Sequence, residues 1–368
     1  MYPKIWRHFD YVLVMVAILL ITYGVIMINS AAPMAESEGL MSNFVTRQIM
    51  HGLLGLALMV LVALIDYHLL ENVARLIYVL ALLSLGVVFI LGRIYGGAQR
   101  WIDFGLFPFQ PSEFSKVLLV VVLAKYLADR EGEGQRFYHI LISIIIVAVP
   151  MILIYLQPDL GTALALAIIW LGMMLMVGIR LRYLLLVGAA GISLLPLIWL
   201  NLEDYMRHRI MIFLDPGKDP LGAGYNTLQA RIGIGAGGWF GQGYMNGTQS
   251  QLYFLRVRHT DFIFSVLAEE LGFAGAIILF TLFALLLWRI LRAASLARDT
   301  FGRLVTTGIA CFLFFQILVN LAMNLGLLPV TGIPLPLVSY GGSSLITVLI
   351  GLGLTESVVM RHKRIEFV

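Results

Sequence analysis

The most regular feature of the chain is a series of long apolar runs that contain few charges and are separated by polar segments. A membrane-spanning helix needs about 20 consecutive, mainly apolar residues, and ten runs have roughly this length. They lie near residues 11–30, 48–66, 74–92, 113–128, 139–157, 160–178, 183–200, 262–288, 303–325 and 343–360. The pattern predicts an all-α polytopic membrane protein with ten transmembrane helices, the seventh of them interrupted by Gly and Pro. The first run exceeds the about 7–15 residues of a signal peptide's apolar region, so it predicts a retained helix, with a signal peptide as the alternative.

Basic residues in the segments between these runs predict the orientation of the helices, because cytoplasmic loops are enriched in Lys and Arg. One set of segments holds most of them: Lys4, Arg7, Arg75, Lys125, Arg130, Arg136, Arg180, Arg182, Arg289, Arg292, Arg298, Arg303, Arg361, Lys363 and Arg364. The opposite short segments hold Arg47, Arg93 and Arg100. Both termini are therefore predicted to be cytoplasmic, with a long extracytoplasmic loop at about 201–261 between helices 7 and 8.

Composition narrows the class of protein. Of the 368 residues, 60% are hydrophobic and 12% are charged, whereas about 25% are charged in soluble domains; the mean hydropathy is +0.92. Ten crossings leave no room for a second large soluble domain, so residues 1–368 are interpreted as a single integral-membrane domain. One cysteine, Cys311, excludes an internal disulfide and a cysteine-based metal cluster. The small excess of Lys and Arg over Asp and Glu, 25 to 21, predicts no nucleic-acid-binding surface.

Four predicted helices, the fourth, sixth, eighth and tenth, run from outside to inside and open with a polar motif. The motifs are QPSE at residues 110–113, QPDLGT at 157–162, HTDF at 259–262 and SYGGSS at 339–344. Helix N-termini carry unpaired N–H groups and about half a positive charge, which favours anions such as phosphate. Each motif alone is also typical of an ordinary helix start, but four at one membrane face predict an anion site there.

Ionisable residues in these motifs are candidates for chemistry. Glu113 and Lys116 lie three residues apart on one helix, so they share a face within salt-bridge distance. An ionisable pair inside a membrane indicates function, with a structural bridge as the alternative. Asp261, beside His259 and Thr260, is interpreted as the N-cap of the eighth helix and as a carboxylate able to act as a general base.

Two further acids, Glu269 and Glu270, lie about two turns deeper than Asp261 along the same helix. We expect them to form hydrogen bonds with polar positions on neighbouring helices rather than to react. The polar positions considered are Gln316, Asn320 and Asn324.

The predicted outer loop is rich in glycine and in cations. Ten glycines lie between Gly217 and Gly247, which predicts irregular turns and close backbone approach but matches no nucleotide-binding phosphate loop. Cations of this loop, Arg209 among them, are able to hold a diphosphate; a solvated surface is the alternative. Residues 326–342 are apolar and rich in Gly and Pro, so they predict a non-helical segment that packs against protein or lines a cavity.

The order of the motifs resembles a known family. GGAQRW at 96–101, the QPSE run with Lys116, QPDLGT, Asp215-Pro216 with PLGAGY at 220–225, GTQSQ at 247–251, HTDFIF with AEELG at 259–272, and PLPLVSYGGSS at 334–344 occur in the order found in SEDS proteins (shape, elongation, division and sporulation). The resemblance spans nearly the whole chain. GTQSQ and GIPLP at 332–336 resemble the elongation branch rather than the division branch. Many relatives have Pro-Glu shortly before HTDF, where this chain has Arg256-Val257.

The resemblance implies a peptidoglycan glycosyltransferase of the bacterial cytoplasmic membrane. Such an enzyme polymerises lipid II at the extracytoplasmic face during cell-wall elongation and cell-shape maintenance, with a class B penicillin-binding protein as partner. In this chain Asp261 is the expected base for the acceptor sugar's 4-hydroxyl, and inverting transfer releases undecaprenyl diphosphate. Residues expected to bind the diphosphate or support the site are Glu113, Lys116, Arg100, Asp159, Arg209, His259, Thr260 and Ser339. The sequence predicts no specific cofactor and leaves open a divalent cation, Mg²⁺ or Mn²⁺.

Two other functions are compatible with parts of the pattern. A transporter that flips a lipid-linked sugar also has broken segments and buried charges, but its polar residues should lie near the midplane of both halves. In this sequence they cluster toward one face, without an internal repeat. A passive scaffold for the penicillin-binding protein would leave the charged outer face unexplained.

Overall fold

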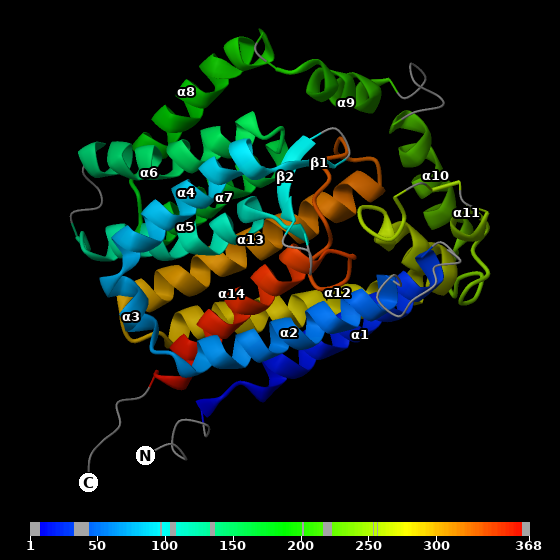
Figure 1. Cartoon of the computed structure of the whole chain (residues 1–368), viewed down its shortest axis with the longest axis horizontal. Helices are drawn as coiled ribbons and strands as arrows, with labels where there is room; N and C mark the ends of the chain where they lie inside the picture. The colour runs from blue at the N-terminus through cyan, green and yellow to red at the C-terminus, as the bar shows by residue number, and fades with distance from the viewer. Residues whose placement is uncertain are drawn as a thin grey trace.

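The computed structural model describes residues 8–32, 44–95, 98–103, 108–132, 137–200, 202–215, 223–252, 254–255 and 257–362. Most of these residues form long helices that lie side by side in a bundle (Figure 1). The long helices are α1 Tyr11–Ala31, α2 Phe44–Leu64, α4 Ala74–Leu91, α5 Pro111–Ala128, α6 Phe137–Leu156, α7 Leu160–Val177, α8 Leu181–Leu200, α12 Ile263–Leu296, α13 Thr300–Asn324 and α14 Gly342–Met360. Each of the ten predicted runs coincides with one of them.

Eight of the described helices are long and apolar enough to cross a membrane, so the chain is a polytopic membrane protein. The two other long helices differ from this group in composition and in apolar length. α5 carries Glu113, Lys116 and Lys125 within its 18 residues, and α8 is apolar over the shorter stretch Leu181–Ser193. α5 buries most of its side chains between neighbouring helices, Glu113 and Lys116 among them, so these two charges face protein rather than lipid.

The centre of the bundle is formed by α13 and α14. Within their apolar windows, 72% of α13 and 94% of α14 is buried, against 22% of α4, so the last two helices are interior and α4 is peripheral. α13 packs against α5, α7 and α12, and α14 packs along α2. α8 lies at the edge of the bundle (Figure 1), and none of its described side chains is buried.

The start of α1 and the end of α14 lie at the same end of the bundle. The backbone N–H of Asp10 donates to Glu356 Oε2 at 3.1 Å, and the rings of His8 and His362 are 4.8 Å apart. The Arg289 guanidinium of α12 pairs with the Asp10 carboxylate at the same end. The two ends of the described helical region therefore lie together.

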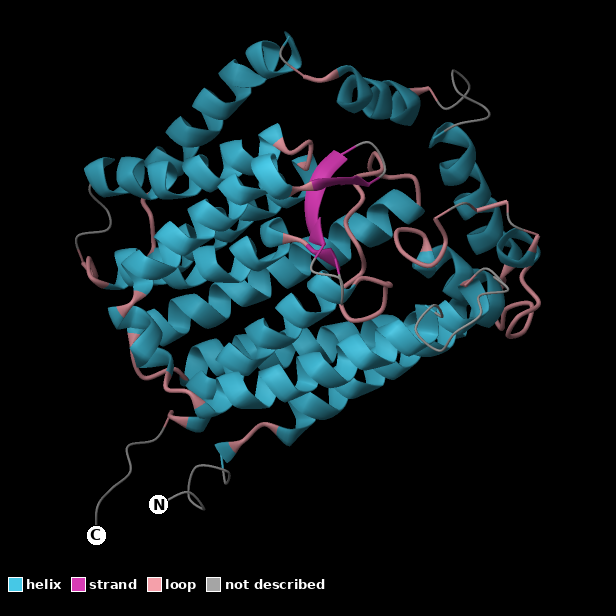
Figure 2. Cartoon of the chain, viewed as in Figure 1, coloured by secondary structure: helices cyan, strands magenta, loops and turns pink. Residues whose placement is uncertain are grey.

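Two parts of the chain differ from the predicted all-α fold with a long outer loop. The segment between α4 and α5 forms a three-stranded antiparallel sheet in the order β1 Arg93–Tyr95, β2 Ala98–Asp103, β3 Pro108–Phe109, drawn in magenta in Figure 2. The segment 201–261 contains the helices α9 Asp204–Leu214, α10 Ala223–Ala236 and α11 Thr248–Gln251. α10 is helical despite its glycines because it packs against α12, and such packing overrides weak intrinsic propensity.

A glycine-rich connection joins α10 to a kink in α12. At Gly272 the backbone leaves helical geometry, with φ 66° and ψ −161°, so neighbouring N–H and C=O groups lose their helical partners. The segment that follows α10 replaces those partners: the N–H groups of Gln242 and Gly243 donate to the carbonyls of Glu269 and Glu270 at 3.0 Å. In the other direction, the N–H groups of Phe273 and Ala274 donate to the carbonyls of Gly238 and Trp239.

Replacing Gly241 by alanine is expected to destabilise this joint. Gly241 has φ +78°, and a Cβ there would collide with the carbonyl of Glu270. Strain and overpacking of this kind cost about 1–3 kcal/mol, so the thermal unfolding temperature in detergent should fall. Gly235→Ala is the matched control, because a Cβ at Gly235 meets nothing within 4 Å; equal unfolding temperatures for the two variants would contradict the expectation.

Candidate active site

The four predicted helix N-terminal motifs meet at one end of the bundle. The N–H of Gln110, before α5, donates to Ser343 Oγ of α14 at 3.1 Å, and its Nε2 donates to Asp159 Oδ2, before α7, at 3.2 Å. The N–H of Tyr340, before α14, donates to the carbonyl of His259, before α12, at 3.0 Å. These contacts link all four helix starts, as the sequence predicts.

The carbonyls of three consecutive residues, His259, Thr260 and Asp261, all accept hydrogen bonds from the C-terminal part of the chain. Besides the bond from Tyr340, Ser339 Oγ donates to the Thr260 carbonyl at 2.6 Å. Two asparagines of α13 donate to the Asp261 carbonyl. The turn that carries Asp261 is therefore held by hydrogen bonds to its backbone carbonyls.

Asp261 lies just outside α12 rather than at its N-cap position. The N–H of Phe262 bonds back to the carbonyl of Val257, which delays the helix to Ile263, and the cap residue Phe262 makes no side-chain cap bond. The N-cap interpretation is therefore wrong. The physical reason is the turn 257–262, which leaves the Asp261 carboxylate free to face its surroundings.

The pKa of the Asp261 carboxyl is shifted in opposite directions by burial and by neighbouring groups. Burial raises its pKa to about 6, while Arg209, a hydrogen bond with Thr260, and Arg100 act in the opposite direction. Although the residue as a whole is partly exposed, desolvation of the carboxyl dominates. A pKa near the working pH is the property expected of a general base.

Arg100 and Asp159 form one network beside Asp261. Arg100, on β2, donates from Nε to the carbonyl of Gln157 at 3.0 Å and also from Nη2 to the carbonyl of Pro158. Its Nη1 lies 3.8 Å from Asp159 Oδ1. Asp159 caps α7 by accepting from the N–H of Thr162 at 3.3 Å. Asp159 is thus occupied by capping, and Arg100 is held by the turn that begins α7.

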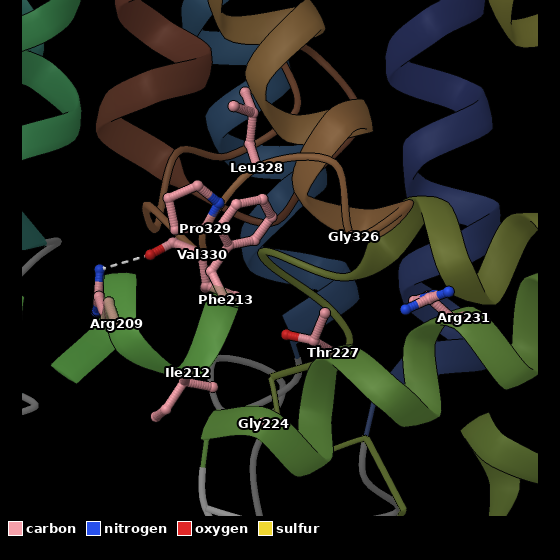
Figure 3. A pocket seen from close by; sticks show the side chains of 10 residues that line it. All are labelled: Arg209, Ile212, Phe213, Gly224, Thr227, Arg231, Gly326, Leu328, Pro329 and Val330. Carbon is pink, nitrogen blue, oxygen red and sulfur yellow. Dashed lines mark hydrogen bonds between the residues drawn. The ribbon is translucent and has the colours of Figure 1, made fainter. Parts of the chain in front are cut away.

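Arg209, on α9, reaches the non-helical segment after α13, where its Nη1 donates to the carbonyl of Val330 at 3.1 Å. It lines two adjoining pockets. The first, shown in Figure 3, is lined by Arg209, Ile212, Phe213, Gly224, Thr227, Arg231, Gly326, Leu328, Pro329 and Val330. The second is lined by Pro158, Leu160, Met206, Arg209, Ile210, Pro329, Val330 and Thr331. The Arg209 guanidinium therefore places a positive charge beside two largely apolar pockets.

The segment 326–342 is non-helical before α14 and packs into the protein, as predicted. Ile333, Leu335, Leu337 and Val338 are all buried. Gly332 lies close to the Asp261 carboxylate, since a Cβ added at Gly332 would be 3.9 Å from Asp261 Oδ2. The segment thus forms one wall beside Asp261.

Glu113 and Lys116 form the predicted pair, with Nζ and Oε2 2.8 Å apart and side-chain exposures of 5% and 1%. Lys116 Nζ also lies 5.8 Å from the centroid of the Phe312 ring. Because Lys116 is buried among the described residues and paired with Glu113, its ammonium is not presented to a diphosphate in this conformation. Among the predicted cations, Arg100 and Arg209 are those that act on Asp261.

His259 and Ser339 have packing and linking contacts. The His259 ring lies 4.7 Å from Phe44 and 5.8 Å from Tyr340, and burial together with Arg258 lowers its pKa, which favours the neutral ring. Ser339 Oγ donates to the Thr260 carbonyl at 2.6 Å and accepts from the N–H of Leu335 at 2.8 Å. Both residues shape the turn that carries Asp261.

The prediction that Glu269 and Glu270 form hydrogen bonds with the polar positions of α13 is wrong. Glu269 accepts from the N–H groups of Gln249 at 2.7 Å and Ser250 at 3.1 Å, and Glu270 accepts from Ser30 Oγ at 2.5 Å. Both glutamates are fully buried and face the GTQSQ segment rather than α13. The GTQSQ segment could not be inferred as the partner of these glutamates, because the contact arises from the packing of α10 and α11 against α12.

Sequence reasoning missed the role of Asn320 and Asn324, which bind the Asp261 carbonyl instead of the glutamates. Their spacing of four residues on an apolar helix was the available signal, because it places two amides on one face. The sheet that carries Arg100 was also missed, since its strands have two to six residues.

Known proteins match the chain over nearly its whole length. The FtsW/RodA/SpoVE family model, described as a cell cycle protein, matches residues 10–364. Peptidoglycan glycosyltransferase MrdB of Escherichia coli K12 is 40% identical over 363 residues, which cover 98% of this chain and 95% of MrdB. A probable peptidoglycan glycosyltransferase FtsW of Geobacter sulfurreducens is 36% identical over 363 residues, 97% of this chain and 96% of the relative.

Solved structures agree with these matches. The rod shape determining protein RodA of Thermus thermophilus matches with a TM-score of 0.72 and 33% identity, over 96% of this chain and 97% of RodA. A chain of a peptidoglycan synthase complex matches with a TM-score of 0.83 and 36% identity, over 97% of this chain and 99% of the other. The chain therefore belongs to the FtsW/RodA/SpoVE family, the SEDS family that its motifs resemble.

Proposed function

We propose that this protein is a peptidoglycan glycosyltransferase that polymerises lipid II during cell-wall elongation. Family membership and the names of MrdB and FtsW support the activity, and the match to RodA supports the role in elongation and cell shape. The observation that carries the proposal is the Asp261 carboxylate, influenced by Arg209 and Arg100 where four helix N-termini meet. The test is polymerisation of lipid II by the purified protein, alone and with its partner.

The proposed topology has ten transmembrane helices, cytoplasmic termini and an extracytoplasmic active face. All ten predicted runs coincide with long helices, which supports the count. The end of the bundle that holds Asp10 and Glu356 also holds Arg289 and Arg361. An excess of basic residues is typical of the cytoplasmic side, so the opposite end, with Asp261, faces outwards.

In the proposed reaction Asp261 removes the proton from the 4-hydroxyl of the acceptor sugar. The hydroxyl oxygen forms a bond to the anomeric carbon of the donor as the bond from that carbon to the diphosphate oxygen breaks. Direct displacement inverts the anomeric centre. Arg209 and Arg100 stabilise the negative charge that develops on the departing undecaprenyl diphosphate, because charge-assisted hydrogen bonds to phosphate are strong.

The pockets beside Arg209 suit a diphosphate attached to a prenyl chain. Ile212, Phe213, Leu328 and Pro329 supply an apolar lining in the first pocket (Figure 3), while Arg209, which lines both pockets, supplies a positive charge. We place the prenyl diphosphate of a lipid substrate here. In this proposal Lys116 does not bind the diphosphate; its ion pair with Glu113 stabilises α5.

A divalent cation fits this site only if the substrate supplies most of its ligands. Among the described residues no group of three or more His, Cys, Asp and Glu side chains is arranged to hold a metal. Mg²⁺ is often bound by one or two carboxylates together with substrate phosphates, and Asp261 is the carboxylate that would contribute. Adding Mg²⁺, Mn²⁺ or a chelator to the polymerisation assay tests this role.

The proposed partner is a class B penicillin-binding protein that cross-links the glycan product. The structural match to a chain of a peptidoglycan synthase complex supports it. Co-purification of the two proteins, and glycan yields with and without the partner, test the assembly.

The rate of polymerisation is expected to rise with pH through about 6 and then to level off. Burial raises the pKa of Asp261 to about 6, so below this pH the carboxyl carries the proton that a base must lack. At pH 5 the initial rate should be about one tenth of the plateau. Unfolding temperatures recorded over the same pH range separate loss of activity from loss of structure. A full rate at pH 5 would contradict the assignment.

A further inference from the structure

We infer that Asn320 and Asn324 of α13 are positioning residues for Asp261, whose backbone carbonyl they hold so that its carboxylate keeps a fixed place. This inference rests on the proposed function, in which Asp261 is the base. Asn320 Nδ2 donates to the Asp261 carbonyl at 3.1 Å, and Asn324 Nδ2 donates to the same oxygen at 2.9 Å. A carbonyl oxygen has two lone pairs, and here the two amides use both.

The Asp261 carbonyl is available for this contact because α12 does not use it. In a regular helix it would accept from the N–H of Ser265, but that N–H bonds to the carbonyl of Phe262 at 3.0 Å. A buried carbonyl without a partner is costly. The amides of α13 therefore complete the backbone at the residue whose side chain is proposed to react.

The orientation of both amides is fixed by further hydrogen bonds. Ser265 Oγ donates to Asn324 Oδ1 at 2.6 Å, which directs Asn324 Nδ2 toward the Asp261 carbonyl. Asn324 Nδ2 also contacts Asn320 Oδ1 at 3.3 Å, which leaves Asn320 Nδ2 to donate. All three side chains are fully buried. Two amides in a membrane helix are expensive unless they are bonded, and these are bonded to the site.

Asn320 also sets the wall that faces Asp261. Its Nδ2 donates to the carbonyl of Ile333 at 2.8 Å. Ile333 follows Gly332, and a Cβ added at Gly332 would lie 3.9 Å from Asp261 Oδ2. One amide thus ties the reactive turn to the segment across from it. Removing the amide would release both sides, and small misplacements of a catalytic group lower the rate strongly, by about 10²-fold for 1 Å.

The first test replaces the donors by apolar groups of similar size. In the Asn320→Leu/Asn324→Leu variant, kcat for lipid II polymerisation should fall at least about tenfold, while the KM for lipid II stays within about twofold. Gln316→Leu is the matched control: Gln316 lies on α13, is 1% exposed, and its Oε1 has no hydrogen-bond partner among the described residues. Wild-type kcat in the double variant, or an equal loss in the control, would overturn the inference.

The second test does not depend on the double variant folding. In Asn324→Asp the ionised carboxylate cannot donate to the Asp261 carbonyl, whereas the protonated acid can. The ratio of its kcat to that of the wild type should therefore rise as the pH falls. A ratio that does not change with pH would overturn the inference.

Comparison with Asp261→Ala separates the two proposals. Full polymerisation by Asp261→Ala would remove Asp261 from the mechanism, and the proposed chemistry would fail. An inactive Asp261→Ala beside fully active asparagine variants would refute the positioning role alone.

Discussion

Asp261→Ala is expected to reduce lipid II polymerisation by about 10²–10⁴-fold, the range that a general base contributes. The Asp261 carboxyl forms a hydrogen bond with Thr260, but the turn is also held by the backbone carbonyls of residues 259–261, so the variant is expected to fold. Glycan formed by the purified protein with its partner is the quantity to measure. Unfolding temperature and co-purification should match those of the wild type.

Two further variants sharpen this test. Asp261→Asn keeps the shape of the side chain and removes the basic oxygen, so it should be as inactive as Asp261→Ala. Asp204→Ala is the control, because Asp204 lies on α9 with a fully exposed side chain and should retain full activity. Equal glycan yields from Asp261→Ala and the wild type would refute the mechanism. Flipping of a lipid-linked sugar in vesicles by the inactive variant would favour the transporter interpretation.

Lys116→Met is expected to destabilise the protein by about 3–5 kcal/mol, because it leaves the buried Glu113 carboxylate without its cation. This is a large part of the about 5–15 kcal/mol that typically separates folded and unfolded states. The unfolding temperature in detergent should fall sharply. Lys125→Met, on the same helix, should change stability by at most about 1 kcal/mol, since Lys125 pairs with Glu71 and Asp129 and its side chain is 31% exposed.

The double variant Glu113→Leu/Lys116→Met decides what the pair does. Removing both charges together is often neutral for stability, so the protein should unfold near the wild-type temperature. Retained polymerisation in this variant would establish a structural role. A stable but inactive double variant would instead assign the pair to substrate. A Lys116→Met protein as stable as the wild type would contradict the premise that the pair is costly to break.

The helices were predictable because long apolar runs report membrane crossings directly. The run at 303–325 corresponds to α13 Thr300–Asn324, and the run at 343–360 corresponds to α14 Gly342–Met360. The meeting of the four motifs was predictable as well, because helices that cross in the same direction start on the same face. The sequence therefore predicts that Arg100, Asp159 and Asp261 belong to one site.

The contacts within the site were not predictable, because they depend on which helices are neighbours. Glu269 was expected to reach α13 and instead accepts from the N–H groups of Gln249 and Ser250. Asn320 and Asn324 were then left with the carbonyl of Asp261. Backbone pairing at Gly272 leaves no signature in side-chain polarity, so the sequence predicted only that glycines would permit close approach.

The joint at Gly272 has a mechanical consequence. Its bonds to residues 238–243 are made by main-chain atoms alone, which do not titrate and are little screened by salt. The attachment of residues 238–243 to α12 through these bonds is therefore expected to change little with pH or ionic strength. A load on residues 238–243 is therefore expected to reach the helix that starts beside Asp261 through main-chain hydrogen bonds, together with the contact between the Trp239 and Phe273 rings.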